Sequence, residues 1–101
     1  MINRIFDPMR TNGTSFHGDK VKATANELEA IIGEPSAEQN GYGEKTNIEW
    51  WFSIGDDVFT IYDWKEYRTI GMDEVIEWHI GGRISTSHVK EIIVNLLNQS
   101  K

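Results

Sequence analysis

Residues 45–64 read KTNIEWWFSIGDDVFTIYDW, and this stretch decides the fold. Alternating positions of an extended chain share one face, and the apolar set here is Ile48, Trp50, Phe52 and Ile54. The polar set on the other face includes Glu49 and Trp51. A short turn at residues 55–57 then leads into a second alternating run over residues 58–64, which predicts a β-hairpin with one buried face.

A third alternating run follows at residues 74–80. It sends Ile76, Trp78 and Ile80 to one face, and Glu77 and His79 to the other. Residues 36–44 and 66–73, which flank the hairpin, are predicted as loops. Three antiparallel strands therefore follow one another along the chain, and their apolar faces predict one shared core.

Two helices complete this core. Thr24 and Glu27 have the spacing of a capping box, and Gly33 with Pro35 ends the first helix. After residue 85 the apolar period becomes helical, with the stripe Val89, Ile92, Ile93, Leu96 and Leu97. The expected N-cap of this second helix is Ser85, Thr86 or Ser87.

The N-terminal region carries weaker signals. Residues 1–10 show no period, so we expect either a loose arm or an edge strand, and residues 11–15 are rich in turn-forming types. A short strand is expected over residues 16–21. The prediction is a single α+β domain over residues 1–101, of order β-α-β-β-β-α, with about four antiparallel strands and both helices on one face.

Composition limits the classes of function. The formal charge of −6 disfavours DNA or RNA binding, and the chain lacks cysteine, which fits a reducing compartment. No long apolar run predicts a signal peptide or a membrane span, so we expect a cytoplasmic protein. His17, His79 and His88 lack metal-ligand spacing, and we expect neither a metal nor a cofactor.

The sheet face opposite the helices is the first candidate site. It carries aromatic rings beside charged groups, namely Glu49, Trp51, Thr60, Tyr62, Trp64, Glu77 and His79. Such a face suits a planar ligand or a partner protein, and it is equally typical of cross-strand pairs that only stabilise a hairpin. Asp63, Glu77 and His79 also suggest an acid, a base and an orienting group, although catalysis is not the favoured hypothesis.

The second candidate is the passage from strand to helix at Gly81-Gly82-Arg83. Glycines allow a ligand to approach the backbone, a helix N-terminus attracts anions, and arginine binds oxyanions in a bidentate manner. The junction could therefore form a phosphate site, although by itself a pair of glycines before a helix is more typical of a simple tight turn. It matches neither a Walker A motif nor a dinucleotide fingerprint.

Four segments carry a family resemblance: residues 12–15 (NGTS), 33–35 (GEP), 60–65 (TIYDWK) and 77–82 (EWHIGG). Through them the chain resembles a group of small, mostly uncharacterised proteins of tailed phages, over nearly its whole length after Arg10. The resemblance implies action on host machinery, including counter-defence by sequestering nucleotide signals or by occluding an immune effector. It implies no catalytic residues.

The leading hypothesis is a non-enzymatic sponge for a small phosphorylated or nucleotide-derived signal, acting as a homo-oligomer. The alternative is an inhibitor that occludes a host defence enzyme through an acidic, aromatic surface. Residues 12–15, 62–65 and 79–83 are expected to lie near one another. The predicted ligand-binding residues are Asn12, Thr14, Ser15, Trp51, Tyr62, Trp64, Lys65, His79, Gly81, Gly82, Arg83 and Ser85.

Overall fold

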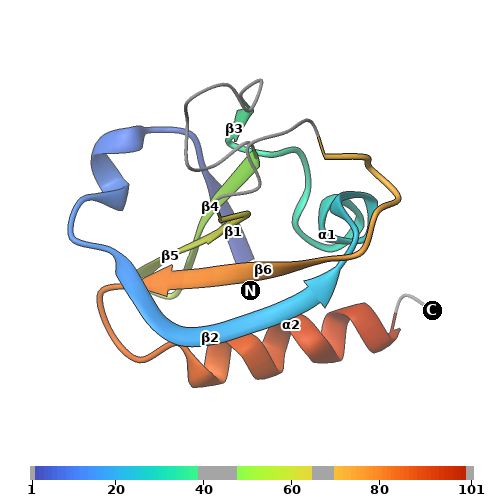
Figure 1. Ribbon diagram of the computed structural model, residues 1–101. Helices are drawn as coiled ribbons and strands as arrows, with labels where there is room; N and C mark the ends of the chain where they lie inside the picture. The colour runs from blue at the N-terminus through green and yellow to red at the C-terminus, as the bar shows by residue number, and fades with distance from the viewer. Residues whose placement is uncertain (1, 39–47, 65–69, 100–101) are drawn as a thin grey trace.

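The computed structural model describes residues 2–38, 48–64 and 70–99. It has an antiparallel sheet with two helices, as predicted for the α+β class (Figure 1). The elements are β1 (Ile2–Ile5), the 3-10 turn η1 (Pro8–Thr11), β2 (Ser15–Ala23), α1 (Ala25–Ile32), β3 (Ala37–Glu38), β4 (Ile48–Ile54), β5 (Asp57–Tyr62), β6 (Ile76–Gly82) and α2 (Ser87–Gln99).

Five strands form the sheet in the order β1-β4-β5-β6-β2, and the two-residue β3 pairs with the start of β4. The expected hairpin is β4 and β5, joined at Gly55, whose φ of 62° lies in the left-handed region. Residues 2–5 form an edge strand along β4 rather than a loose arm, which raises the count above the expected four. Ile5 is buried there, and this burial orders the segment.

Helix α1 begins and ends where the capping signals predict. The Thr24 side chain accepts from the backbone N–H of Glu27 at 3.1 Å, and Glu27 Oε1 accepts from the Thr24 N–H at 2.9 Å. Gly33 follows the helix with φ of 111°. Only short-range contacts are needed for these bonds, which is why the sequence alone located the helix.

The core lies between the helices and one face of the sheet. Trp50, Phe52, Trp78 and Ile80 are fully buried, as the alternation predicts. Both helices cover this face: Leu28 of α1 and Val89, Ile93 and Leu97 of α2 belong to the same cluster. In Figure 1, α2 runs alongside β2 while α1 lies near the C-terminal end of that strand.

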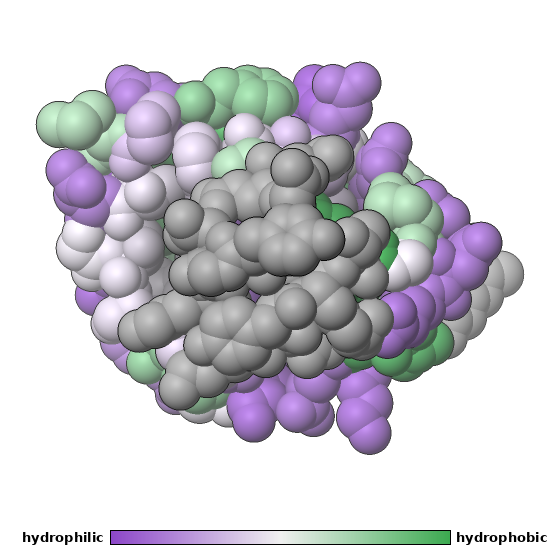
Figure 2. All heavy atoms as spheres, turned by 45° about the horizontal axis from the view of Figure 1, so that its top comes forward, coloured by the Kyte–Doolittle hydropathy of each residue, from purple (hydrophilic) through white to green (hydrophobic). Residues whose placement is uncertain are grey.

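The opposite face is not left open, which corrects the expectation of an uncovered platform. The turn η1 packs over β5, and Thr60, Ser53 and Gly81 are buried. Figure 2 shows the side that carries η1 and β3, where hydrophilic and apolar side chains intermix around the grey segments. The segment that crosses here links β1 at one edge of the sheet to β2 at the other edge.

Strand β6 extends two residues further than predicted. Gly81 and Gly82 pair with Thr60 and Phe59 of β5, so they belong to the sheet and not to a turn. Neither glycine has positive φ. The helical period begins only at Ser87, and the connection is therefore residues 83–86.

Candidate functional site

Three strands place the polar and aromatic side chains in register. Glu49 lies opposite Tyr62, and Tyr62 lies opposite His79, in one row across β4, β5 and β6. Thr60 lies opposite both Trp51 and Gly81 in the next row. Because directly paired residues point to the same face, this register assembles the predicted sheet face.

A pocket of about 190 Å³ opens between this face and residues 11–15, which cross over it. Its wall consists of Thr11, Thr14, Ser15, Glu49, Thr60, Tyr62, Trp64 and Gly81. Five of these residues were predicted as ligand-binding from the sequence: Thr14, Ser15, Tyr62, Trp64 and Gly81. We call this cavity the hydroxyl pocket, because five of the eight described residues that line it carry a hydroxyl group.

Glycine is required at the floor of the hydroxyl pocket. A Cβ at Gly81 would stand 2.6 Å from Thr60 Oγ1 and 3.4 Å from Tyr62 Cε1. The absent side chain lets the Thr60 hydroxyl group and the Tyr62 ring approach the β6 backbone. A ligand in the pocket would therefore meet hydroxyl groups and strand backbone rather than an aliphatic wall.

Glu49 gives the pocket its acidic character. Its Oε1 accepts from Trp51 Nε1 at 2.9 Å, which fixes the carboxylate on the sheet face. Thr14 Oγ1 donates to the Thr11 carbonyl at 2.8 Å. Trp51 itself is half-buried and does not line the pocket, so its role here is to position Glu49.

Four aromatic rings gather beside the pocket, and we call them the aromatic cluster: Phe16, Tyr62, Trp64 and His79. The His79 ring stacks on Phe16 at 4.2 Å and on Trp64 at 6.0 Å between centroids. Tyr62 meets Trp64 edge-on at 6.1 Å. Phe16 and Trp64 are 41% and 40% exposed, so the cluster presents ring surface to solvent.

Phe16 was not predicted as a site residue. It pairs with Gly81, and the register between β2 and β6 shifts between Phe16 and Lys20. This irregularity, next to Gly18 with φ of 99°, aims the Phe16 ring at His79. In the sequence near Phe16, only Gly18 indicates that the strand is irregular. A glycine does not indicate in which direction the Phe16 side chain then points.

The environment keeps both titratable rings of the cluster uncharged at neutral pH. Burial lowers the pKa of His79, the nearby Lys20 lowers it further, and Glu77 opposes the shift. Burial and the Glu49 carboxylate raise the pKa of Tyr62. A neutral imidazole and a protonated phenol therefore face a ligand at pH 7.

The lowered pKa of His79 predicts how stability depends on pH. Between that lowered pKa and the usual value of 6.5, the unfolded chain binds a proton that the folded chain does not. This contribution is present above pH 6.5 and is lost as the pH falls through the window. Replacing His79 with Gln should flatten the dependence of the thermal midpoint on pH below 6.5; an unchanged slope would contradict the assignment.

Arg83 does not extend freely toward a ligand. Its Nε donates to the Asn12 carbonyl at 2.8 Å, and its Nη2 donates to the Arg10 carbonyl. The guanidinium thus holds residues 10–12 over the sheet face. Asn12 takes part through its backbone, and Arg83 supports the wall of the hydroxyl pocket instead of clamping an anion.

The start of α2 already has a carboxylate beside it. Thr86 is fully buried, its carbonyl accepts from Lys90 N, and its Oγ1 donates to Asp19 Oδ2 at 2.6 Å. Ser85 lies 3.4 Å from Ser87, Oγ to Oγ. Because Asp19 repels a second anion, this geometry disfavours the phosphate site expected at the helix N-terminus.

Gly82 faces the core and not a ligand. A Cβ there would stand 2.8 Å from Phe59 Cδ1 and 3.1 Å from Thr86 Cγ2. The absence of a side chain serves packing between β5, β6 and α2. Lys65, the remaining predicted residue, lies outside the described residues.

The suggested catalytic carboxylates have structural partners. Asp63 is fully buried and accepts from the Ile48 N–H at 2.9 Å, which fastens the end of β5 to the start of β4. Glu77 pairs with Lys20 at 3.6 Å. Each of the three segments expected to converge contributes to the lining of the hydroxyl pocket, with Thr14 and Ser15, Tyr62 and Trp64, and Gly81.

The described residues hold no group of three or more histidine or acidic side chains placed to bind a metal ion. Over the same ranges, no helix has the length and apolar character that a bilayer crossing requires. Comparison of the chain with family models, curated proteins and solved structures finds no match. The candidate site therefore rests on its geometry.

Proposed function

We propose that this protein is a non-enzymatic binding protein that sequesters a small nucleotide-derived signal, as a phage-type counter-defence factor in the host cytoplasm. The observation that carries this proposal is the hydroxyl pocket beside the aromatic cluster. Sequestration requires only a pre-organised site, and the register of β4, β5 and β6 supplies one.

The size of the pocket decides which part of the ligand enters. At about 190 Å³ it is smaller than the ~300–1,000 Å³ typical of complete ligand sites. It therefore takes one planar ring system, and the rest of the ligand lies against the exposed Phe16 and Trp64 rings. A nucleobase fits this division, because it combines a flat ring with edges that form hydrogen bonds.

The charges orient the ligand. The Glu49 carboxylate accepts hydrogen bonds from an exocyclic amino group and repels phosphate. Lys20 lies opposite His79 on β2, on the far side of the aromatic cluster from Glu49. The base therefore points toward Glu49, and the phosphate points toward Lys20 and solvent.

The test is a thermal-shift screen of the purified chain with cyclic dinucleotides, cyclic ADP-ribose isomers and mononucleotides, followed by ligand recovery after denaturation. At about a hundredfold over its dissociation constant, a bound ligand should stabilise the fold by roughly 2.7 kcal/mol. Intact recovered ligand supports sequestration, whereas altered ligand would show turnover. Size-exclusion chromatography with and without ligand tests the expected homo-oligomer.

Replacing Trp64 with alanine should weaken binding of the best nucleotide by about 1–3 kcal/mol, or roughly 5- to 150-fold, through loss of ring stacking. Titration calorimetry measures the change. Ile84→Ala is the matched control, because Ile84 is also an exposed apolar residue, at 45%, and does not line the pocket. If Trp64→Ala and the wild type bound the nucleotide with equal affinity, the aromatic cluster would not be part of the binding site.

A second candidate function is inhibition of a host defence enzyme by direct occlusion. The exposed Phe16 and Trp64 rings favour it, since exposed aromatics on a rigid sheet are typical anchors at protein interfaces. Inhibition of such an enzyme with no nucleotide present would support this candidate. If in addition no nucleotide stabilises the chain, the sequestration proposal fails.

A further inference from the structure

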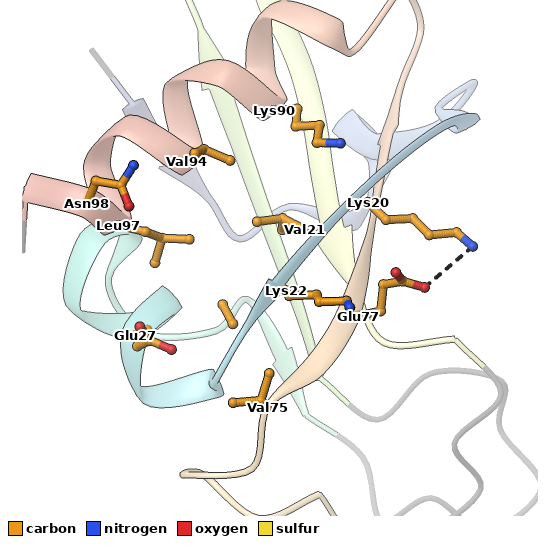
Figure 3. A pocket seen from close by; sticks show the side chains of 11 residues that line it. Lys20, Val21, Lys22, Glu27, Val75, Glu77, Lys90, Val94, Leu97 and Asn98 are labelled. Atoms are coloured by element: carbon orange, nitrogen blue, oxygen red, sulfur yellow. Dashed lines mark ion pairs between the residues drawn. The ribbon is translucent and has the colours of Figure 1, made fainter. Parts of the chain in front are cut away.

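A second cavity lies on a different surface, at the free edge of β2. It has a volume of about 480 Å³ and lies between β2 and α2 (Figure 3). Its lining includes Lys20, Lys22 and Lys90 together with the apolar Val21, Val94 and Leu97. We call it the lysine groove. None of these residues lines the hydroxyl pocket.

The groove has an open strand as one wall. β2 is the last strand of the sheet and pairs only with β6 among the described residues. Its pairing is regular over Lys20, Val21, Lys22 and Ala23, after the shift that follows Phe16. A sheet edge of this kind presents backbone donors and acceptors that can pair with an added strand.

The two faces of the β2 edge differ in chemistry. Lys20 and Lys22 lie opposite His79 and Glu77, on the face away from the core. Val21 lies opposite Trp78, on the core face, where Val94 and Leu97 project from α2 (Figure 3). An added strand would therefore meet lysines on one face and aliphatic side chains on the other.

The unpaired charges of the groove are positive. Glu77 is paired with Lys20 at 3.6 Å, and Glu27 is bonded to the backbone of Thr24. Neither Lys22 nor Lys90 forms an ion pair within the part of the chain that the structure describes. Two ammonium groups thus border this groove on a chain whose formal charge is −6.

We propose that the lysine groove docks an extended acidic segment of a partner protein, which adds to β2 as a further strand. Acidic side chains of the segment alternate with apolar ones: the acids meet Lys20 and Lys22, and the apolar residues pack on Val94 and Leu97. Lysines along an edge discourage uncharged strands from pairing, so they select an acidic partner. Lys20 is the one described residue that this surface shares with the proposed nucleotide site, and no described residue of the lysine groove lines the hydroxyl pocket. The peptide experiment is therefore done without nucleotide.

The probe is a fluorescent peptide of roughly eight alternating Glu and Val residues, long enough to cover the regular edge. We expect saturable binding by fluorescence anisotropy that weakens as salt is raised. The double variant Lys22→Glu, Lys90→Glu should lose at least about tenfold in affinity. The single variant Arg10→Glu, which inverts a charge outside the groove, should bind like the wild type. Thermal midpoints confirm that each variant is folded.

A second peptide separates strand addition from simple charge attraction. It has the same sequence with N-methyl groups on alternate amides, which removes backbone donors and leaves every charge in place. We expect the methylated peptide not to bind, and the β2 amides to gain protection from hydrogen exchange only with the unmodified peptide. The proposal would be overturned if both peptides bound equally or if neither bound. It would also be overturned if the double variant and Arg10→Glu lost equal amounts of peptide affinity.

Discussion

Replacing Trp78 with alanine is expected to lower the free energy of unfolding by roughly 3–5 kcal/mol, a large share of the stability of a small domain. Trp78 is fully buried, and its Nε1 donates to the Ala23 carbonyl at 2.9 Å. Its ring meets Trp50 edge-on at 5.3 Å. The substitution removes this packing and leaves a buried carbonyl without its donor. Urea unfolding followed by circular dichroism measures the loss.

Trp64→Ala is the matched control for this experiment, since it deletes the same side chain at a position that is 40% exposed. It should change the free energy of unfolding little while weakening nucleotide binding, so stability and binding should separate between the two tryptophans. If Trp78→Ala unfolds normally and Trp51→Ala is the unstable variant, the assignment of the strand faces is wrong.

Gly82→Val is expected to destabilise the fold by roughly 1–3 kcal/mol through overpacking. A Cβ at Gly82 already lies 2.8 Å from Phe59 Cδ1, and valine adds two methyl groups beyond it. Phe59 and Thr86 are both fully buried and cannot move into solvent. The same unfolding assay measures the effect.

The control for Gly82→Val is Gly71→Val, because among the described residues a Cβ at Gly71 meets only the Glu74 side chain, at 3.7 Å. That variant should unfold close to the wild type. A Gly82→Val variant with wild-type stability would contradict the tight packing of β5, β6 and α2 around Gly82. If the variant instead lost nucleotide binding and kept its stability, Gly82 would belong to the ligand site, as the sequence predicted.

Local signals predicted the parts of the fold that local contacts create. Thr24, Glu27 and Gly33 define α1 within a few residues of sequence, and the alternation around Trp50 assigns the buried face of β4. The sequence does not decide between a loose arm and a strand for β1, because a four-residue strand has too few positions to show a period. Its pairing with β4 spans about half the chain, and nothing within the strand itself encodes that partner.

The distinction between local and distant contacts also explains which parts of the candidate site were predicted from the sequence. The sequence predicted that Tyr62, Trp64 and His79 share a surface, since a period of two fixes which residues face the same way. It did not predict that η1 would cover that surface and turn it into a pocket, or that Arg83 would bind the carbonyl of Asn12, 71 residues earlier. The role of Gly82 was misassigned for the same reason, since the contacts that require a glycine there come from Phe59 and Thr86.

The sequence by itself determined the α+β class, the capped first helix and the face on which the tryptophans Trp50 and Trp78 are buried, because periodicity and capping act over one or two turns of chain. The tertiary structure alone decided that residues 10–15 enclose a hydroxyl pocket, that Phe16 joins the aromatic cluster, and that β2 has a free edge beside α2. These features depend on which distant segments meet, and that is settled by the packing of the whole chain around one core.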